Sequence, residues 1–228
     1  MTTKRDVQRI LAPLATRHGD LAVVGRYIVL TPIRHYLRAV QVDRTGSAHV
    51  VNPRWFVYPM FKPWRFANPT WGCLLYRRSG SWRASDPEVP DELREEIERN
   101  ALPILRSITS FADFTSLIRR GWTSPGKTHA DWIMHHGSDK IVMHVALGEI
   151  EQARELATVH LSRLPDPSPK DADSYARHLF GLKRLKALLD AEDRSGMITV
   201  LHEWEAETVR NMKLEAYWQP SPFPIERG

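Results

Sequence analysis

Residues 21–42 read LAVVGRYIVLTPIRHYLRAVQV. The run is rich in β-branched and aromatic side chains, which favour extended strands. Residues 21–33 and residues 35–42 are therefore each predicted to form a strand. The connection between them is too short to hold a crossover helix, so the two strands must run antiparallel. This stretch predicts an antiparallel sheet in the first half of the chain.

The strand pattern continues after this stretch, and a helix precedes it. Thr45 and Gly46 supply a turn, and further strands are predicted at residues 48–51, 54–61 and 72–78. Residues 4–18 place their apolar side chains on one helical face, which predicts an amphipathic helix that Pro13 kinks or ends. The first half is thus one helix followed by a mostly antiparallel sheet.

The second half has the periodicity of helices. Ser110 and Asp113 form a capping-box signature for a helix over residues 111–120. Gly148 is predicted to hinge a helix pair, Gly137 to end the helix before that pair, and Ser195 with Gly196 to separate the last two helices. The prolines of the tail, residues 218–228, exclude regular structure.

Together these patterns predict an α+β fold, with an N-terminal helix and a mostly antiparallel sheet followed by a helical C-terminal half. An α+β domain is expected over residues 1–125. A helical region over residues 126–228 is expected to pack on it and form one compact unit.

Composition predicts a cytoplasmic protein that does not associate with a membrane. Cys73 is the single cysteine, so no intrachain disulfide is possible, which suits a reducing compartment. The N-terminal residues lack the apolar run of a signal peptide, and no apolar stretch reaches membrane-spanning length.

Charge is divided unevenly along the chain. Residues 1–84 carry a net charge of +11 and the remainder carries −6. The basic half is expected either to hold an acidic partner or to pair with the acidic half of the same chain.

Residues 121–128, GWTSPGKT, match the phosphate-loop pattern. A working loop needs a buried strand before it and free amide hydrogens within it. Helical spacing precedes Gly121, and Pro125 has no amide hydrogen. We therefore interpret the match as a loop between two helices, and we expect no nucleotide and no other cofactor.

Histidines and carboxylates gather over residues 129–144: His129, Asp131, His135, His136, Asp139 and His144. Such side chains can bind zinc or iron, but their spacing fits no established ligand pattern. No metal site is predicted. No catalytic residue is predicted either, because the chain has no nucleophile elbow and Cys73 stands among apolar residues.

Tryptophans alternate with basic residues between positions 54 and 83. Such a face can stack bases and hold phosphates, can bind a protein, or can pack as ordinary core. The candidate binding residues of the first half are Arg34, His35, Arg38, Arg54, Trp55, Lys62, Trp64 and Arg65.

The order of these pieces is similar to a run found in an uncharacterised family of bacterial helix-plus-sheet proteins. The matching residues are Gly25, Arg26, Pro32, Arg34, His35, Arg38, Asp43, Arg44, Pro59 and Phe61. The resemblance covers about residues 1–120. It implies a bacterial cytosolic protein of unknown activity and adds no catalytic residue. Distant relatives of this type can sit in contact-toxin and defence loci, which implies a role in protein interaction.

The leading hypothesis is therefore a non-catalytic protein-binding protein of the immunity or adaptor kind, with another protein as its partner. The alternative is a nucleic-acid-binding protein that uses the basic aromatic half. A nucleotide- or metal-dependent enzyme is the third possibility.

Overall fold

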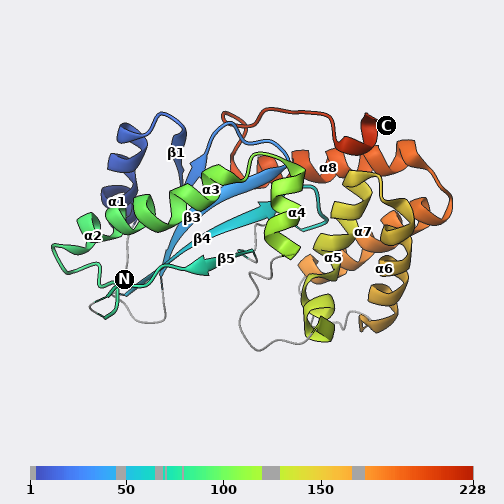
Figure 1. Ribbon diagram of the computed structural model, residues 1–228, viewed down its shortest axis with the longest axis horizontal. Coiled ribbons are helices and arrows are strands. Elements are labelled where there is room, and N and C mark those ends of the chain that lie inside the picture. The colour runs from blue at the N-terminus through green and yellow to red at the C-terminus, as the bar shows by residue number, and fades with distance from the viewer. Residues whose placement is uncertain are drawn as a thin grey trace. The chain divides into compact units, whose positions relative to one another are not determined.

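The computed structural model describes residues 4–44, 50–64, 69, 71–78, 80–119, 129–165 and 173–227. It has the predicted α+β fold, with an N-terminal helix, a five-stranded antiparallel sheet and a helical C-terminal half (Figure 1). The chain divides into two compact units. The first consists of residues 1–58, 68–122 and 216–219. The second consists of residues 59–67, 123–215 and 220–228.

The sheet of the first unit is a meander with its strands in sequence order, from β1 to β5. They are β1 (Leu21–Val24), β2 (Tyr27–Leu30), β3 (Tyr36–Arg44), β4 (Val51–Pro59) and β5 (Trp71–Leu74). The prediction of one strand over residues 21–33 was wrong, because this run folds into the hairpin of β1 and β2. Gly25 allows the hairpin turn, since it takes a φ of +60° that other residues rarely adopt.

β5 approaches β4 so closely that only glycine fits at position 72. A Cβ atom there would lie 1.9 Å from the carbonyl oxygen of Trp55, which is main chain and cannot move aside alone. Trp55 pairs directly with Cys73 in this register. The exposed Cys73 therefore sits on an edge strand next to a position that admits no side chain.

The first helix, α1 (Lys4–Arg17), was predicted over residues 4–18 with Pro13 as a kink or an end. It runs through Pro13 and ends four residues later, so Pro13 does not end it. The apolar face explains its continuation. Leu11 and Leu14, on either side of Pro13, are both fully buried. Burial of this face outweighs the one backbone hydrogen bond that proline removes.

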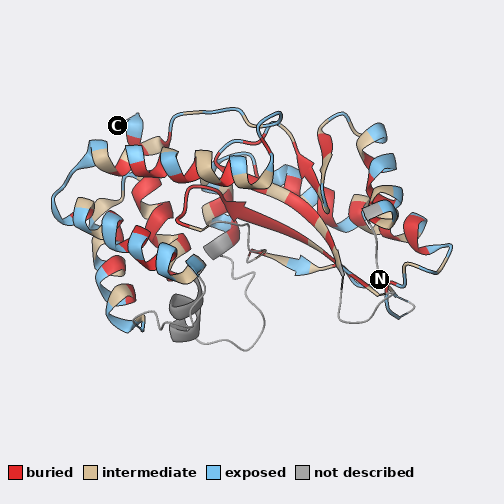
Figure 2. Ribbon diagram, turned by 180° about the vertical axis from the view of Figure 1, so that it is seen from behind, coloured by how far each residue is buried: buried red, intermediate tan, exposed pale blue. Residues whose placement is uncertain are grey.

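Four further helical segments complete the first unit: α2 (Val89–Glu96), η1 (Ile97–Ala101), α3 (Leu102–Ser107) and α4 (Phe111–Arg119). The capping box is confirmed, because Asp113 accepts from the Ser110 amide at 2.9 Å and its own amide donates to Ser110 Oγ at 3.1 Å. α4 packs on the sheet where the ring of Phe114 stacks on Tyr36, 5.3 Å between centroids. Burial raises the pKa of Tyr36 to about 12. Figure 2 shows most of the long strands of this sheet as buried.

The second unit is built from α5 (His129–Leu147), α6 (Ile150–Arg163), α7 (Asp173–Asp190), α8 (Arg194–Met212) and the short 3₁₀ helix η2 (Pro224–Glu226). α6 contacts both α5 and α7, and α8 contacts both α7 and α5. The predicted hinge at Gly148 is confirmed, since this residue connects α5 to α6 with a φ of +81°.

Two predicted helix boundaries in this unit were wrong. Gly137 lies inside α5, where a Cβ atom would come within 2.3 Å of His160 Nδ1, so the glycine makes room for that ring. Ser195 and Gly196 lie in the first turn of α8, whose N-cap is Asp193. The Asp193 side chain accepts from the Gly196 amide at 2.8 Å and caps α8, which starts at Arg194, three residues before the predicted start at Met197.

The tail is more ordered than its prolines predict. Phe223 and Ile225 are buried in the second unit. Phe223 is the N-cap of η2, and Ile225 lies within it. The side chain of Glu226 accepts from the Phe223 amide at 2.7 Å and lies 2.8 Å from His202 Nε2. Apolar burial and these bonds hold a segment that has almost no helical propensity of its own.

No helix in the described part of the chain combines the length and the apolar character that a membrane crossing requires.

Candidate binding site

Two of the predicted binding residues, Arg34 and His35, join segments of the first unit. Arg34 donates from Nη2 to the side-chain oxygen of Gln219 at 3.0 Å. His35 is 6% exposed, and its ring centre lies 5.1 Å from that of Phe111 on α4. Both residues thus hold distant parts of the chain together within this unit.

Arg38 is mostly buried and bonds to the main chain. Its Nη1 donates to the carbonyl of Ile108, just beyond α3, at 2.9 Å, and its Nη2 donates to the carbonyl of Pro32 at 3.4 Å. Burial lowers the pKa of its guanidinium. The arrangement ties the end of α3 to the sheet.

Replacing Arg38 with methionine is expected to lower the free energy of unfolding of the protein by about 1.5–3 kcal/mol, because a charge-assisted hydrogen bond to Ile108 is lost. Urea unfolding measures this change. Arg34→Met is the matched control, with a loss below about 0.5 kcal/mol, since Arg34 is exposed. Equal stability of Arg38→Met and the wild type would contradict a structural role for Arg38.

Arg54 and Trp55 are neighbours on β4 but differ in burial. Trp55 is 2% exposed and belongs to the core. Arg54 is half-buried, and its Nη1 lies 3.5 Å from the carbonyl of Pro69. The five predicted residues of the first unit therefore include two that are buried, and they do not form one continuous exposed face.

The remaining predicted residues belong to the second unit. Lys62 and Asp139 form a buried ion pair, 2.6 Å from Nζ to Oδ1, with side-chain exposures of 6% and 3%. Trp64 is half-buried and meets the ring of His178 edge-on at 4.7 Å. Arg65 lies outside the described residues.

Two histidines that the sequence patterns did not single out complete this buried cluster. His160 is 3% exposed and His178 is 7% exposed. Neither Nδ1 atom has a hydrogen-bond partner within the described part of the chain. Burial lowers the pKa of both rings. The pKa of His178 falls to about 4 because the Lys62 charge adds to the effect of burial. Both rings are therefore neutral at pH 7.

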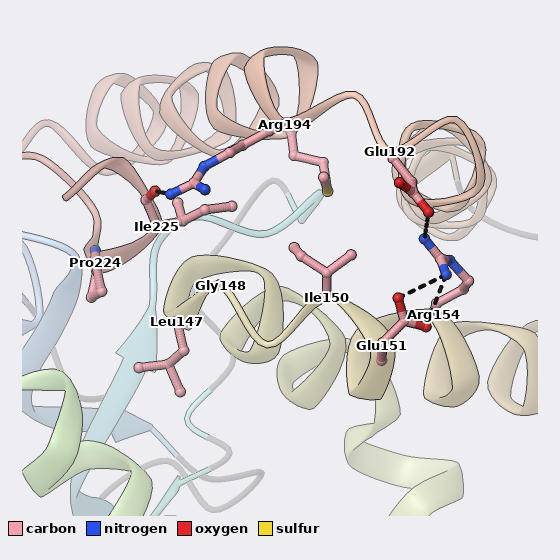
Figure 3. A pocket seen from close by; sticks show the side chains of 10 residues that line it. Leu147, Gly148, Ile150, Glu151, Arg154, Glu192, Arg194, Pro224 and Ile225 are labelled. Atoms are coloured by element: carbon pink, nitrogen blue, oxygen red, sulfur yellow. Dashed lines mark hydrogen bonds and ion pairs between the residues drawn. The ribbon is translucent and has the colours of Figure 1, made fainter. Parts of the chain in front are cut away.

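A cleft of about 450 Å³ opens elsewhere in the second unit, between the α5–α6 hinge, the start of α8 and η2 (Figure 3). Its apolar lining consists of Leu147, Ile150, Met197, Pro224 and Ile225. Leu147 and Ile150 are only half-buried and so present apolar surface to solvent there. This volume falls in the range of ligand pockets, about 300–1,000 Å³.

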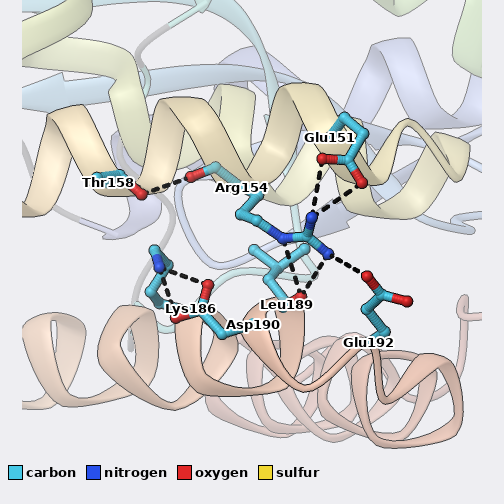
Figure 4. Close-up of polar contacts among 7 residues, drawn as sticks. All are labelled: Glu151, Arg154, Thr158, Lys186, Leu189, Asp190 and Glu192. Carbon is cyan, nitrogen blue, oxygen red and sulfur yellow. Dashed lines mark hydrogen bonds and ion pairs between the residues drawn. The ribbon is translucent and has the colours of Figure 1, made fainter.

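One side of the cleft carries a closed polar network around Arg154 (Figure 4). The guanidinium donates to Glu151 at 2.8 Å, to Glu192 at 3.2 Å and to the carbonyl of Leu189 at 3.0 Å. Nε also donates to the Leu189 carbonyl, at 3.2 Å, so donors on all three nitrogens are used, and the bonds join α6 to the end of α7. Arg154 therefore shapes this side of the cleft, and its charge is already balanced.

The other side of the cleft carries Arg194, the first residue of α8. Its Nη2 donates to the carbonyl of Ile225, which places the guanidinium beside the apolar lining (Figure 3). No carboxylate pairs with Arg194 within the ranges that the structure describes. The cleft thus has an apolar centre, a side on which two carboxylates share one guanidinium, and a cationic side.

A smaller groove of about 280 Å³ lies in the first unit beside the exposed Tyr76. Arg77 pairs there with Asp86 at 2.8 Å and with Glu92 at 2.5 Å. Nearby in the same unit, Arg17 pairs with Glu98 at 2.7 Å. Basic residues of the first 84 positions are thus paired with acids from the rest of the chain.

The phosphate-loop match at residues 121–128 lies outside the described residues, and so do the side chains of His129, Asp131, His135 and His136. In the same histidine-rich stretch, Asp139 pairs with Lys62, and His144 Nδ1 lies 2.6 Å from the carboxylate of Glu149. Within the described ranges, no three His, Cys, Asp or Glu side chains come together to hold a metal ion.

Comparison with known proteins adds no relative: no family model, no curated protein and no solved structure matches the chain. The resemblance to the bacterial helix-plus-sheet family stays a prediction.

Proposed function

We propose that this chain is a non-catalytic protein-binding protein whose helical unit receives its partner in the cleft beside Gly148. The cleft carries this proposal because it combines half-buried Leu147 and Ile150 with charged groups at its sides. Apolar centres with charged or polar rims are typical of protein-recognition sites. Covering the exposed apolar surface removes it from water and favours association.

The internal pairing of charge supports this proposal over nucleic-acid binding. Arg17, Lys62 and Arg77 all belong to the basic half, and each has a carboxylate partner within its own unit. A guanidinium or ammonium already held by a carboxylate binds a phosphate only after that pair is broken. Part of the excess basic charge therefore forms ion pairs within the protein and does not face a nucleic acid.

Replacing Ile150 with arginine is expected to abolish capture of the partner, because the new charge enters the apolar centre of the cleft. The tagged wild type, Ile150→Arg and Thr158→Arg would each be incubated with lysate of the source cells, and retained proteins would be identified by mass spectrometry. Thr158→Arg is the matched control, since it adds the same charge on an exposed site of the same helix outside the cleft lining.

The expected result is a protein retained by the wild type and by Thr158→Arg and lost with Ile150→Arg. Three identical sets of retained proteins would contradict the proposal. Retention of nucleic acid in place of protein, with binding that weakens steeply as salt rises, would instead favour the alternative function.

A further inference from the structure

The cationic side of the cleft contains unused hydrogen-bond donors. A guanidinium has five N–H groups, and the one hydrogen bond recorded for Arg194 goes to the carbonyl of Ile225. Its other donors have no acceptor among the residues that the structure describes. Arg154, the second arginine of the cleft, differs because its three nitrogens are engaged by two carboxylates and a carbonyl.

One nitrogen of the exposed Arg194 is held by a hydrogen bond before any ligand arrives. Its bond to Ile225 joins the start of α8 to η2, and Ile225 itself is 2% exposed. A donor that is already held in place loses little conformational freedom when it binds an anion. Planar guanidinium groups match the two oxygens of a carboxylate.

The apolar lining begins directly beside this guanidinium. Ile225 accepts the bond from Arg194, Met197 follows Arg194 by one turn of α8, and Ile150 faces them across the cleft (Figure 3). An anionic group and an apolar group of the same ligand must therefore lie close together to use both features. In the last residue of a peptide, the carboxylate and the side chain leave the same carbon atom.

We propose that the cleft binds the carboxyl terminus of a partner protein that ends in an apolar residue. The terminal carboxylate pairs with Arg194, and the last side chain enters the apolar centre between Ile150 and Ile225. The two carboxylates of the lining, Glu151 and Glu192, share the single positive charge of Arg154, so that side keeps one excess negative charge and favours the terminal carboxylate at the opposite, Arg194 side. This inference rests on the proposed function and names the part of the partner that is recognised.

Two pools of fluorescein-labelled pentapeptides test the inference on the full chain. Both pools are random at the first four positions and end in Leu, Ile, Val or Phe, and one pool carries a free carboxylate while the other carries an amide. Fluorescence anisotropy is expected to show that the free-acid pool binds about tenfold or more tightly than the amide pool, since a charge-assisted pair is worth at least that factor.

Variants assign the effect to the proposed residues. Arg194→Gln is expected to remove the difference between the pools, because glutamine can still donate to Ile225 but carries no charge. Ile150→Arg is expected to weaken binding of the amide pool at least about tenfold, through loss of apolar contact, and Thr158→Arg is expected to behave as the wild type. The comparison of acid with amide on the wild type needs no variant, so it stands even if one variant fails to fold.

Equal affinity of the two pools, no binding of either pool, or an acid preference that persists in Arg194→Gln would each overturn the inference. A partner captured by the wild type and lost with Ile150→Arg would still support the proposed function in these cases. The peptide experiment therefore tests only the inference about the carboxyl terminus, and the capture experiment tests the proposed function.

Discussion

Replacing Lys62 with methionine is expected to lower the free energy of unfolding of the protein by about 3–5 kcal/mol, the range observed when one partner of a buried ion pair is removed. Lys62 Nζ lies 2.6 Å from Asp139 Oδ1, and both side chains are almost wholly shielded from water. Without the ammonium group, the buried Asp139 carboxylate loses its ion pair with Lys62 in surroundings where hydration cannot replace that pair. Urea unfolding monitored by tryptophan fluorescence measures the loss.

A double variant and a surface pair serve as controls for this prediction. Lys62→Met combined with Asp139→Leu is expected to recover most of the stability, because no isolated charge then remains. Lys186→Met breaks a pair with Asp190, whose side chain is 50% exposed, and is expected to cost less than about 1 kcal/mol. Equal losses from Lys62→Met and Lys186→Met would show that the buried pair carries no special weight.

Acidification from pH 6.5 to pH 4 is expected to destabilise the protein through His178 by about 3 kcal/mol, at 1.36 kcal/mol for each pH unit between the two pKa values. Burial, aided by the Lys62 charge, lowers the pKa of His178 to about 4 in the folded protein, against an ordinary value of 6.5. The unfolded chain therefore binds the proton first as the pH falls. Stability is complete above pH 6.5 and decreases down to pH 4.

His160 acts in the same direction, because burial lowers its pKa as well. The free energy of unfolding would be measured by urea titration at half-unit steps of pH between 4 and 7. His178→Phe is expected to reduce the slope of stability against pH. A slope that is unchanged in His178→Phe would mean that another group causes the acid sensitivity.

Short-range patterns in the sequence correctly predicted the features that depend on a few neighbouring residues. The short connection after residue 33 required antiparallel strands, and the sheet is an antiparallel meander. Ser110 and Asp113 form the predicted capping box, and Gly148 forms the predicted hinge. In each case the deciding interaction spans only a few residues of chain.

Two helix ends differ from expectation where tertiary packing acts, and a third differs at Ser195 and Gly196 because the cap at Asp193 lies earlier in the chain. Gly137 looked like a helix end, yet it lies within α5 because the ring of His160 packs against it. Pro13 was predicted to kink or end its helix, yet α1 continues to Arg17 with Leu14 buried in the core. Local propensity is worth about 1 kcal/mol for glycine and about 3 kcal/mol for proline, and burial of neighbouring side chains can exceed it.

The contrast between features set by neighbouring residues and features set by distant ones is stronger at the candidate site. The order of residues along the chain encodes the alternation that builds the sheet, the periodicity that builds the helices and the uneven distribution of charge. The fold alone buries Lys62 against Asp139 and places Arg194 beside Ile225 at a cleft. The first pair is separated by 77 residues and the second by 31. Burial and charge pairing depend on which distant side chains the fold brings together, and no pattern of neighbouring residues encodes that choice.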